Sequence, residues 1–327
     1  MSNSKNILYL ISLILLMLTG CEADSSFAPF PNEGEEPVEV RLHATTLGAS
    51  VEVSRASDGT IPLPQNTKVG MWGGTYQNLE LNYDHNTEAL NTTDQSKIYY
   101  PLKTDEMHIY TYAPYSTEAY NTEDNTVWVR SLFDEQNANR SHYITDPIWA
   151  GDTITKGEAV NGVISASLKF KHVMSRLQIF FVHDRGKTYE NIDFSIEFDK
   201  VQYGKMSMET GEITPAYSGS EIYKREMGSK TLDSKENTTT PQYDYTVFPG
   251  SILKKVYIYN IKDTNGYSDS YEYDFTAEGN RPFPALEAGK IYKMIIDLGK
   301  IDGSYNEPSI PEWPNDSWPD DNNDLEF

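Results

Sequence analysis

Apolar and polar residues alternate with a period of two through most of the chain. From Val38, apolar side chains occupy every second position to Ala44, and the alternation resumes from Leu47 to Val53. This spacing places the apolar side chains on one face of an extended strand, so each such stretch predicts a half-buried β-strand. Further strands are predicted over Val69–Met71, Met107–Tyr112, Val127–Val129, Leu168–Phe170, Leu177–Phe181, Phe194–Phe198, Val256–Tyr259, Tyr271–Phe275 and Ile291–Leu298.

No segment has the sustained period of an amphipathic helix, and the nearest candidate is the short stretch His172–Leu177. The connections between the predicted strands are rich in Asn, Asp, Gly, Ser and Thr, which close turns. Residues 215–244 are polar and are interpreted as one long loop or a pair of loops. Many short strands with turns between them predict an all-β fold built from sandwiches.

The N-terminus carries a different pattern. An apolar run from Ile7 to Leu18 follows Lys5 and ends at Leu18-Thr-Gly-Cys21. The run is too short to cross a hydrocarbon core of ~30 Å and is typical of a signal peptide over residues 1–20. Its end resembles the bacterial lipobox, which implies cleavage before Cys21, attachment of lipid such as palmitate to Cys21, and an outer-membrane location. An ordinary signal peptide with an incidental cysteine is the alternative.

The remaining length predicts two domains, because about 150 residues is usual for one. Residues 21–37 contain three prolines and several acids and are predicted to be a tether. The two predicted β-sandwiches cover residues 38–165 and 166–300. Residues 301–327 combine proline, tryptophan and acidic residues, and they are predicted to be an appendage because proline does not fit a central strand.

Charge and motifs exclude several classes of function. The chain has 49 acidic and 27 basic residues, a net charge of −22, which argues against nucleic-acid binding. The six histidines show no ligand spacing, and no hydrolase elbow or phosphate loop occurs. We therefore predict no enzymatic activity, no cofactor and no metal site. Some of the 23 tyrosines and five tryptophans could form a carbohydrate-stacking face, with core packing as the alternative.

Four sequence blocks follow one another along the chain. They are Tyr99–Pro101 together with Met107–Tyr115, then Asp146–Ala150, Leu168–Leu177 and Leu286–Tyr292. In this order they resemble the fimbrillins, the type V pilin subunits of the Bacteroidetes. The resemblance covers residues 38–298 and implies two transthyretin-like β-sandwich domains in tandem. It also implies a structural subunit of a cell-surface fimbria, with other fimbrial subunits as partners.

Ser54-Arg55-Ala56 falls where many fimbrillins carry an arginine before the first core block. The resemblance implies that an arginine-specific protease cuts between Arg55 and Ala56, and that a neighbouring subunit's strand then fills the groove left by the first strand. Arg41 is a second candidate for the cut. The Trp- and Pro-rich end departs from the major pilins, which leaves stalk, tip and accessory roles open. The alternative function is a surface-anchored, monomeric binding module for glycans or host ligands.

Overall fold

We describe the fold from a computed structural model. The described residues are 37–47, 60–131, 144–183, 186–199, 203–216, 221–226, 228–232, 234, 241–266, 268–278, 280, 282–301 and 323–326. The chain divides into two units, Met1–Pro37 and Val38–Phe327, and all elements belong to the second. The predicted signal peptide and nearly all of the predicted tether therefore lie outside the described residues, as does the predicted strand continuation from 48 to 53.

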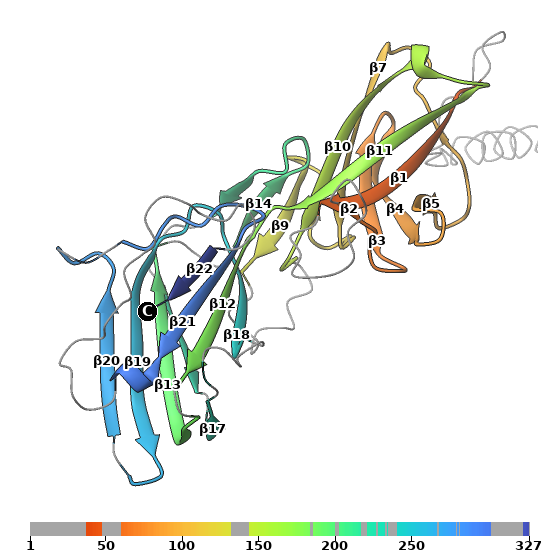
Figure 1. The fold of residues 1–327 in the computed structure, drawn as a ribbon. Coiled ribbons are helices and arrows are strands. Elements are labelled where there is room, and N and C mark those ends of the chain that lie inside the picture. Colours follow the sequence, from red (N-terminus) through yellow and green to blue (C-terminus); the bar gives the residue numbers. More distant parts are fainter. Residues whose placement is uncertain are drawn as a thin grey trace, which may run out of the picture. The chain divides into compact units, whose positions relative to one another are not determined.

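Strands form nearly all of the described regular structure, which confirms the predicted all-β class (Figure 1). The short helical pieces are η2 (Lys156–Glu158) and α2 (Leu298–Ile301). The strands are β1 (Glu39–Leu47), β2 (Thr60–Ile61), β3 (Lys68–Gly73), β4 (Tyr76–Asp84), β5 (Ala89–Thr92), β6 (Ile98–Tyr99), β7 (Glu106–Ala113), β8 (Tyr120–Asn121), β9 (Thr126–Arg130), β10 (Ile148–Thr155), β11 (Val163–His172), β12 (Ser175–Val182), β13 (Thr188–Phe198), β14 (Tyr203–Ser207), β15 (Ile213–Pro215), β16 (Glu221–Glu226), β17 (Lys230–Thr231), β18 (Tyr243–Val247), β19 (Leu253–Asp263), β20 (Ser268–Asp274), β21 (Ile291–Asp297) and β22 (Asn323–Glu326).

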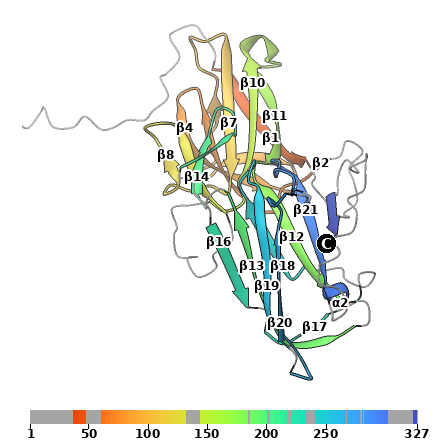
Figure 2. The same cartoon turned by 90° about the vertical axis from the view of Figure 1, so that its left-hand side faces the viewer.

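The first sheet has nine strands in the order β11-β10-β7-β3-β4-β5-β1-β2, with β6 also paired to β1. β11 stands at one end of this order and β1 stands near the other. These two strands also pair with each other in parallel, so the sheet closes on itself. Figure 2 shows β1, β10 and β11 as neighbours from a second direction. Its inward side chains form one buried cluster, to which β1 and β11 contribute Val40, Leu42, Leu168 and Phe170.

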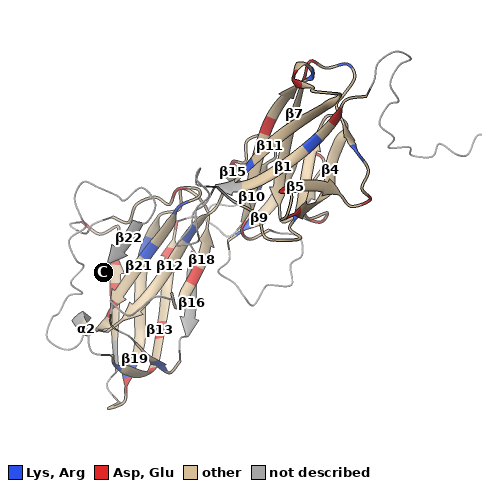
Figure 3. Cartoon of the chain, turned by 45° about the vertical axis from the view of Figure 1, so that its right-hand side comes forward, with Lys and Arg blue, Asp and Glu red and all other residues tan. Residues whose placement is uncertain are grey.

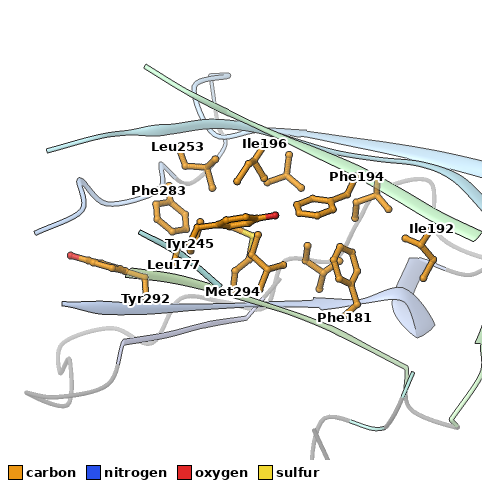
Figure 4. Packing of buried hydrophobic residues seen from close by; sticks show 14 of the residues in the cluster. Leu177, Phe181, Ile192, Phe194, Ile196, Tyr245, Leu253, Phe283, Tyr292 and Met294 are labelled. Atoms are coloured by element: carbon orange, nitrogen blue, oxygen red, sulfur yellow. The ribbon is translucent and has the colours of Figure 1, made fainter. Parts of the chain in front are cut away.

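Two further sheets face each other across a second core and form a sandwich. One has the order β18-β12-β21-β22, and the other has the order β16-β13-β19-β20 with β17 beside β13. Figure 4 shows the side chains of this core interleaved between the two layers. Phe181 of β12 and Phe194 of β13 meet edge to face, with ring centroids 5.4 Å apart. Such contacts add to the stabilisation from burial of the apolar area.

The fourth sheet, β15-β14-β9-β8, combines strands from before and after residue 165. It packs on a third cluster that includes Val127, Val129 and Met206. β11 runs through the predicted division between residues 165 and 166 and pairs with β1 along eight residues. The tandem arrangement of transthyretin-like domains with that boundary stays a prediction.

Three interpretations of local sequence need correction or refinement. The polar stretch 215–244 is not only loop, because β16 and β17 lie within it and both pair with β13. The candidate helix His172–Leu177 is wrong, because β11 ends at His172 and β12 begins at Ser175. Most of the predicted C-terminal appendage lies outside the described residues, but β22 pairs parallel with β21 at the edge of its sheet.

Candidate functional site: strand β1 and its place in the first sheet

Strand β1 completes the first sheet between strands that are distant in sequence. Its longest ladder is the parallel pairing with β11, from Glu39 opposite Val163 to Thr46 opposite Phe170. On its other side it pairs with β2, β5 and β6, by two residue pairs in each case. The β1 backbone is therefore held firmly along one edge and by short, separate ladders along the other.

The inward face of β1 supplies part of the core. Val40, Leu42 and Ala44 are 3%, 1% and 0% exposed, and all three belong to the buried cluster of the first sheet. The alternation that predicted this strand thus places small and medium apolar side chains against the core. Full burial of a Val or Leu side chain is worth roughly 1.5–3 kcal/mol, so loss of β1 would expose a costly apolar surface.

The outward face of β1 is polar. The Arg41 side chain donates to the Glu39 carboxylate at 2.8 Å, and Lys97 donates to the second Glu39 oxygen. The hydrogen bond from Lys97, followed by that from Arg41, holds the pKa of Glu39 below its usual value. Lys97 belongs to the segment between β5 and β6, so this carboxylate links β1 to its antiparallel neighbours.

We expect Glu39 to contribute to acid sensitivity. A carboxyl group whose pKa is lowered on folding stabilises the folded chain above the pKa of the unfolded state, about 4.3 for Glu. That contribution is lost as the pH falls through the lower, folded pKa. In urea titrations between pH 6 and pH 3, Glu39→Gln should therefore show a smaller loss of stability than the wild type. Equal losses would contradict a role for this carboxylate.

A polar groove of about 690 Å³ lies beside β1 where its antiparallel pairing is interrupted. Its lining includes Arg41 and His43 of β1, Asn82 and Asp84 of β4, and Asn91 of β5. Because β5 pairs with β1 only at Leu42 and His43, this edge of β1 lacks a continuous ladder. The groove thus marks the side on which β1 is least tightly bound.

The predicted site residues fall in different parts of the chain. Cys21, Arg55 and Ala56 lie outside the described residues. Arg41 lies within the β1 ladder, opposite Ser165 of β11. His172 forms a 3.0 Å contact with Asp146. Two of the sequence blocks that resemble the fimbrillins therefore meet there.

Other residues of the sequence blocks form contacts that stabilise the fold. Gly289, with φ of +72°, donates its N–H to Met174 O at 2.8 Å, and a Cβ there would lie 3.2 Å from His172 O. Glycine is favoured at such a position because it adopts positive φ without steric cost. Arg176 forms two hydrogen bonds with the Asp244 carboxylate and so ties β12 to β18. These contacts hold strand junctions together.

Within the described residues, no group of three or more His, Cys, Asp or Glu side chains is arranged to hold a metal ion. No helix in that part of the chain is long and apolar enough to span a bilayer.

Solved structures share this fold at low sequence identity. A "putative cell adhesion protein" of Bacteroides ovatus is 14% identical, covers 81% of this chain and 93% of its own, and superposes with a TM-score of 0.55. A second protein so described, from Bacteroides uniformis, is 14% identical over 81% of this chain and 95% of its own, with a TM-score of 0.50. A fimbrial protein of Bacteroides vulgatus is 12% identical over 81% and 96%, with a TM-score of 0.45.

No curated protein sequence matches the chain significantly. At 14% identity the structural likeness shows the fold alone. A family model described as fimbrillin-like matches residues 54–313, which is most of the chain. The chain therefore belongs to the fimbrillin-like family.

Proposed function

We propose that the protein is a structural subunit of a cell-surface fimbria and that it assembles by strand exchange after cleavage at Arg55. The observation that carries this proposal is the position of β1. This strand fills a gap in the first sheet, its inward side chains lie in the core, and it precedes Arg55 in the chain. Membership of the fimbrillin-like family supports the fimbrial role, and two solved proteins of similar fold are described as putative cell adhesion proteins.

Cleavage at Arg55 would change how β1 is held. The fragment before the cut contains all of β1, whereas β2 and β11 remain on the other side. After the cut, β1 stays in place only through non-covalent contacts. Its departure would leave the edge of β11 unpaired and expose the core beside Leu42. A strand from a neighbouring subunit could restore both the ladder and the burial, which is recognition by strand addition.

Arg55 is favoured over Arg41 as the cleaved residue. The Arg41 backbone is part of the parallel ladder with β11, and its side chain is paired with Glu39. Proteases cut most readily where the backbone is not held in such a ladder. A cut after Arg41 would also divide β1 and leave Leu42 and Ala44 on the large fragment.

Treatment of the purified full chain with an arginine-specific protease tests this proposal. We expect the wild type to be cut after Arg55 and to form assemblies detectable by light scattering. Arg55→Ala should remain monomeric, whereas the matched variant Arg41→Ala should be cut and should assemble like the wild type. A wild-type chain that is trimmed at Arg55 and yet stays monomeric at high concentration, with other subunits present, would refute strand exchange.

We further propose that Cys21 carries the lipid that anchors the protein in the outer membrane. The support is the apolar run that ends in Leu18-Thr-Gly-Cys21 and the absence of a second cysteine that could form a disulfide. Cys21→Ser should abolish incorporation of labelled palmitate and should leave the signal peptide attached. Labelling of the variant at the wild-type level would show that the lipid is attached elsewhere or that the cysteine is incidental.

A further inference from the structure

The polar groove beside β1 is a hollow on the outer face of the first sheet, and its floor follows from the register of three strands. β4, β5 and β1 are successive neighbours in this sheet. Their pairing sets Asp84, Ala89 and His43 in one row across the sheet, and all three line the groove. Because alanine carries only a methyl group, the row is lowest at its middle position. A second row joins Asn82 of β4 to Asn91 of β5.

Two loops complete the lining, and each is held by hydrogen bonds of its own. In the loop before β3, the Gln65 side-chain oxygen accepts the backbone N–H of His85 at 3.0 Å. In the loop after β5, the Thr92 hydroxyl donates to Ser96 O at 2.7 Å, and the Ser96 N–H donates to Asp94 Oδ1 at 3.0 Å. These bonds fix both loops before a ligand arrives, which reduces the entropy lost on binding.

The groove has the size of a small-molecule site and an unusually polar lining. Its volume of about 690 Å³ lies within the range of roughly 300–1,000 Å³ that is usual for ligand sites. Such sites are mostly apolar, whereas five side chains of this lining are amides: Gln65, Asn66, Asn82, Asn91 and Gln95. Each side-chain amide offers two donors and one acceptor, so the lining matches a ligand that both donates and accepts hydrogen bonds along its length.

The charges along the groove balance. The lining includes two carboxylates, Glu39 and Asp84, and two cations, Arg41 and Lys97. Glu39 binds both cations, so their charge is already engaged within the protein. Figure 3 shows acidic and basic positions interspersed among uncharged ones on the strands of this sheet. The lining thus favours a neutral ligand over an anion or a cation.

The floor offers neither a sheet edge for a peptide nor an aromatic platform. β4, β5 and β1 all have strand neighbours on both sides. The gap between the pairings of β1 with β6 and with β5 is one residue, Arg41, which is too short for an added strand. Among the described residues of the lining, the only Tyr, Trp or Phe is Tyr83, which is 2% exposed. Extended peptides and flat aromatic ligands therefore fit this groove poorly.

We propose that the groove binds a short neutral oligosaccharide. A sugar hydroxyl donates one hydrogen bond and accepts others, so neighbouring hydroxyls match the alternating donors and acceptors of the amide side chains. Asn91 and His43 are exposed, so their polar atoms are open to the ligand, and the low position at Ala89 receives the edge of a sugar ring. This inference goes beyond the proposed function, because it assigns a small ligand to the uncut subunit.

An array of neutral oligosaccharides of two to six sugars, with sulfated and sialylated ones beside them, tests the inference on the purified full chain without protease treatment. We expect the wild type to bind at least one neutral oligosaccharide, whose Kd is then measured by calorimetry. Ala89→Leu fills the lowest part of the floor and should weaken this binding about tenfold. Asn91→Ala should weaken it about fivefold, the effect of one lost hydrogen bond. The Kd should not change as salt is raised from about 0.1 M to about 0.5 M, because the ligand is uncharged.

The matched controls are Ala277→Leu and Gln77→Ala. They enlarge an alanine and truncate an amide side chain at exposed positions that do not line the groove. Both variants should bind the oligosaccharide like the wild type. Circular dichroism of all four variants shows that each is folded, and the exposed position of Asn91 makes its truncation the safer of the two groove substitutions.

Several outcomes would overturn the inference. These are no binding of any neutral oligosaccharide by a folded wild-type chain, or equal binding by the groove variants and the controls. Tighter binding of a sulfated or sialylated oligosaccharide, or a Kd that rises with salt, would assign the groove to an anionic ligand instead. Because uncut chain is used, failure here leaves the strand-exchange proposal standing, and failure of assembly leaves this one standing.

Discussion

Leu42→Ala is expected to lower the free energy of unfolding of the intact chain by about 3 kcal/mol, within the range for truncation of a buried Leu. Leu42 is 1% exposed and lies in the middle of β1, between Val40 and Ala44, which also face the core. The strand is held between β11 and β5 at this point, so the surrounding backbone cannot readily collapse into the space. Urea denaturation followed by tryptophan fluorescence measures the loss.

His43→Ala is the matched control, because His43 is the next residue of the same strand and faces solvent. Its effect should lie within about 0.5 kcal/mol, as is usual for surface substitutions. If residues up to Arg55 leave after cleavage, cut wild-type and cut Leu42→Ala chains should become equally stable, because neither retains the strand. A persistent difference after cleavage would show that β1 remains bound.

Gly70→Ala is expected to destabilise the chain by about 3 kcal/mol, at the upper end of the usual cost of overpacking. An added Cβ would lie 2.2 Å from the ring of Tyr112 and 2.8 Å from Asn78 Oδ1. The ring cannot move aside freely, because Tyr112 is fully buried and its hydroxyl donates to Asn78 Oδ1 at 2.7 Å. Burial raises the pKa of this hydroxyl above its usual value.

Gly157→Ala provides the comparison for this substitution. It makes the same change of one methyl group, but at a glycine with no other atom within 4 Å of the new Cβ. Thermal unfolding of the two variants should show a clearly lower midpoint only for Gly70→Ala. Similar midpoints would mean that Tyr112 and Asn78 rearrange at little cost.

Alternation predicted those strands whose two faces differ in environment. β1 and β11 show it clearly, since Val40 and Leu42, like Leu168 and Phe170, face the core while their neighbours face solvent. In such strands the pattern follows directly from burial of one face. The all-β class and the positions of the central strands could therefore be predicted from the sequence.

Edge strands and strand partners could not be predicted in the same way. β16, with the sequence EIYKRE, lies at the edge of its sheet, and charged residues are common on edges because they oppose pairing with other chains. Its composition therefore led to a loop interpretation. The alternation in β1 indicated a buried face but carried no information on its parallel partner, which is set by contacts distant in the sequence.

The grouping of three aromatic residues could not be predicted from the sequence. The sequence indicated that aromatic side chains could either form a ligand-stacking face or pack in a core, and Trp72, Tyr110 and Trp149 pack against the third buried cluster. They are separated by tens of residues and meet because β3, β7 and β10 are neighbours.

The parallel ladder between β1 and β11 also sets the order in which the chain can fold. β1 is among the first strands to be synthesised, yet its main partner follows about 120 residues later, and contacts so distant in sequence form slowly because a long loop must first be closed. Until β11 is available, Val40 and Leu42 have no complete core to enter. The nascent chain thus passes through a period in which its first strand is open to capture by any extended segment that reaches it before β11.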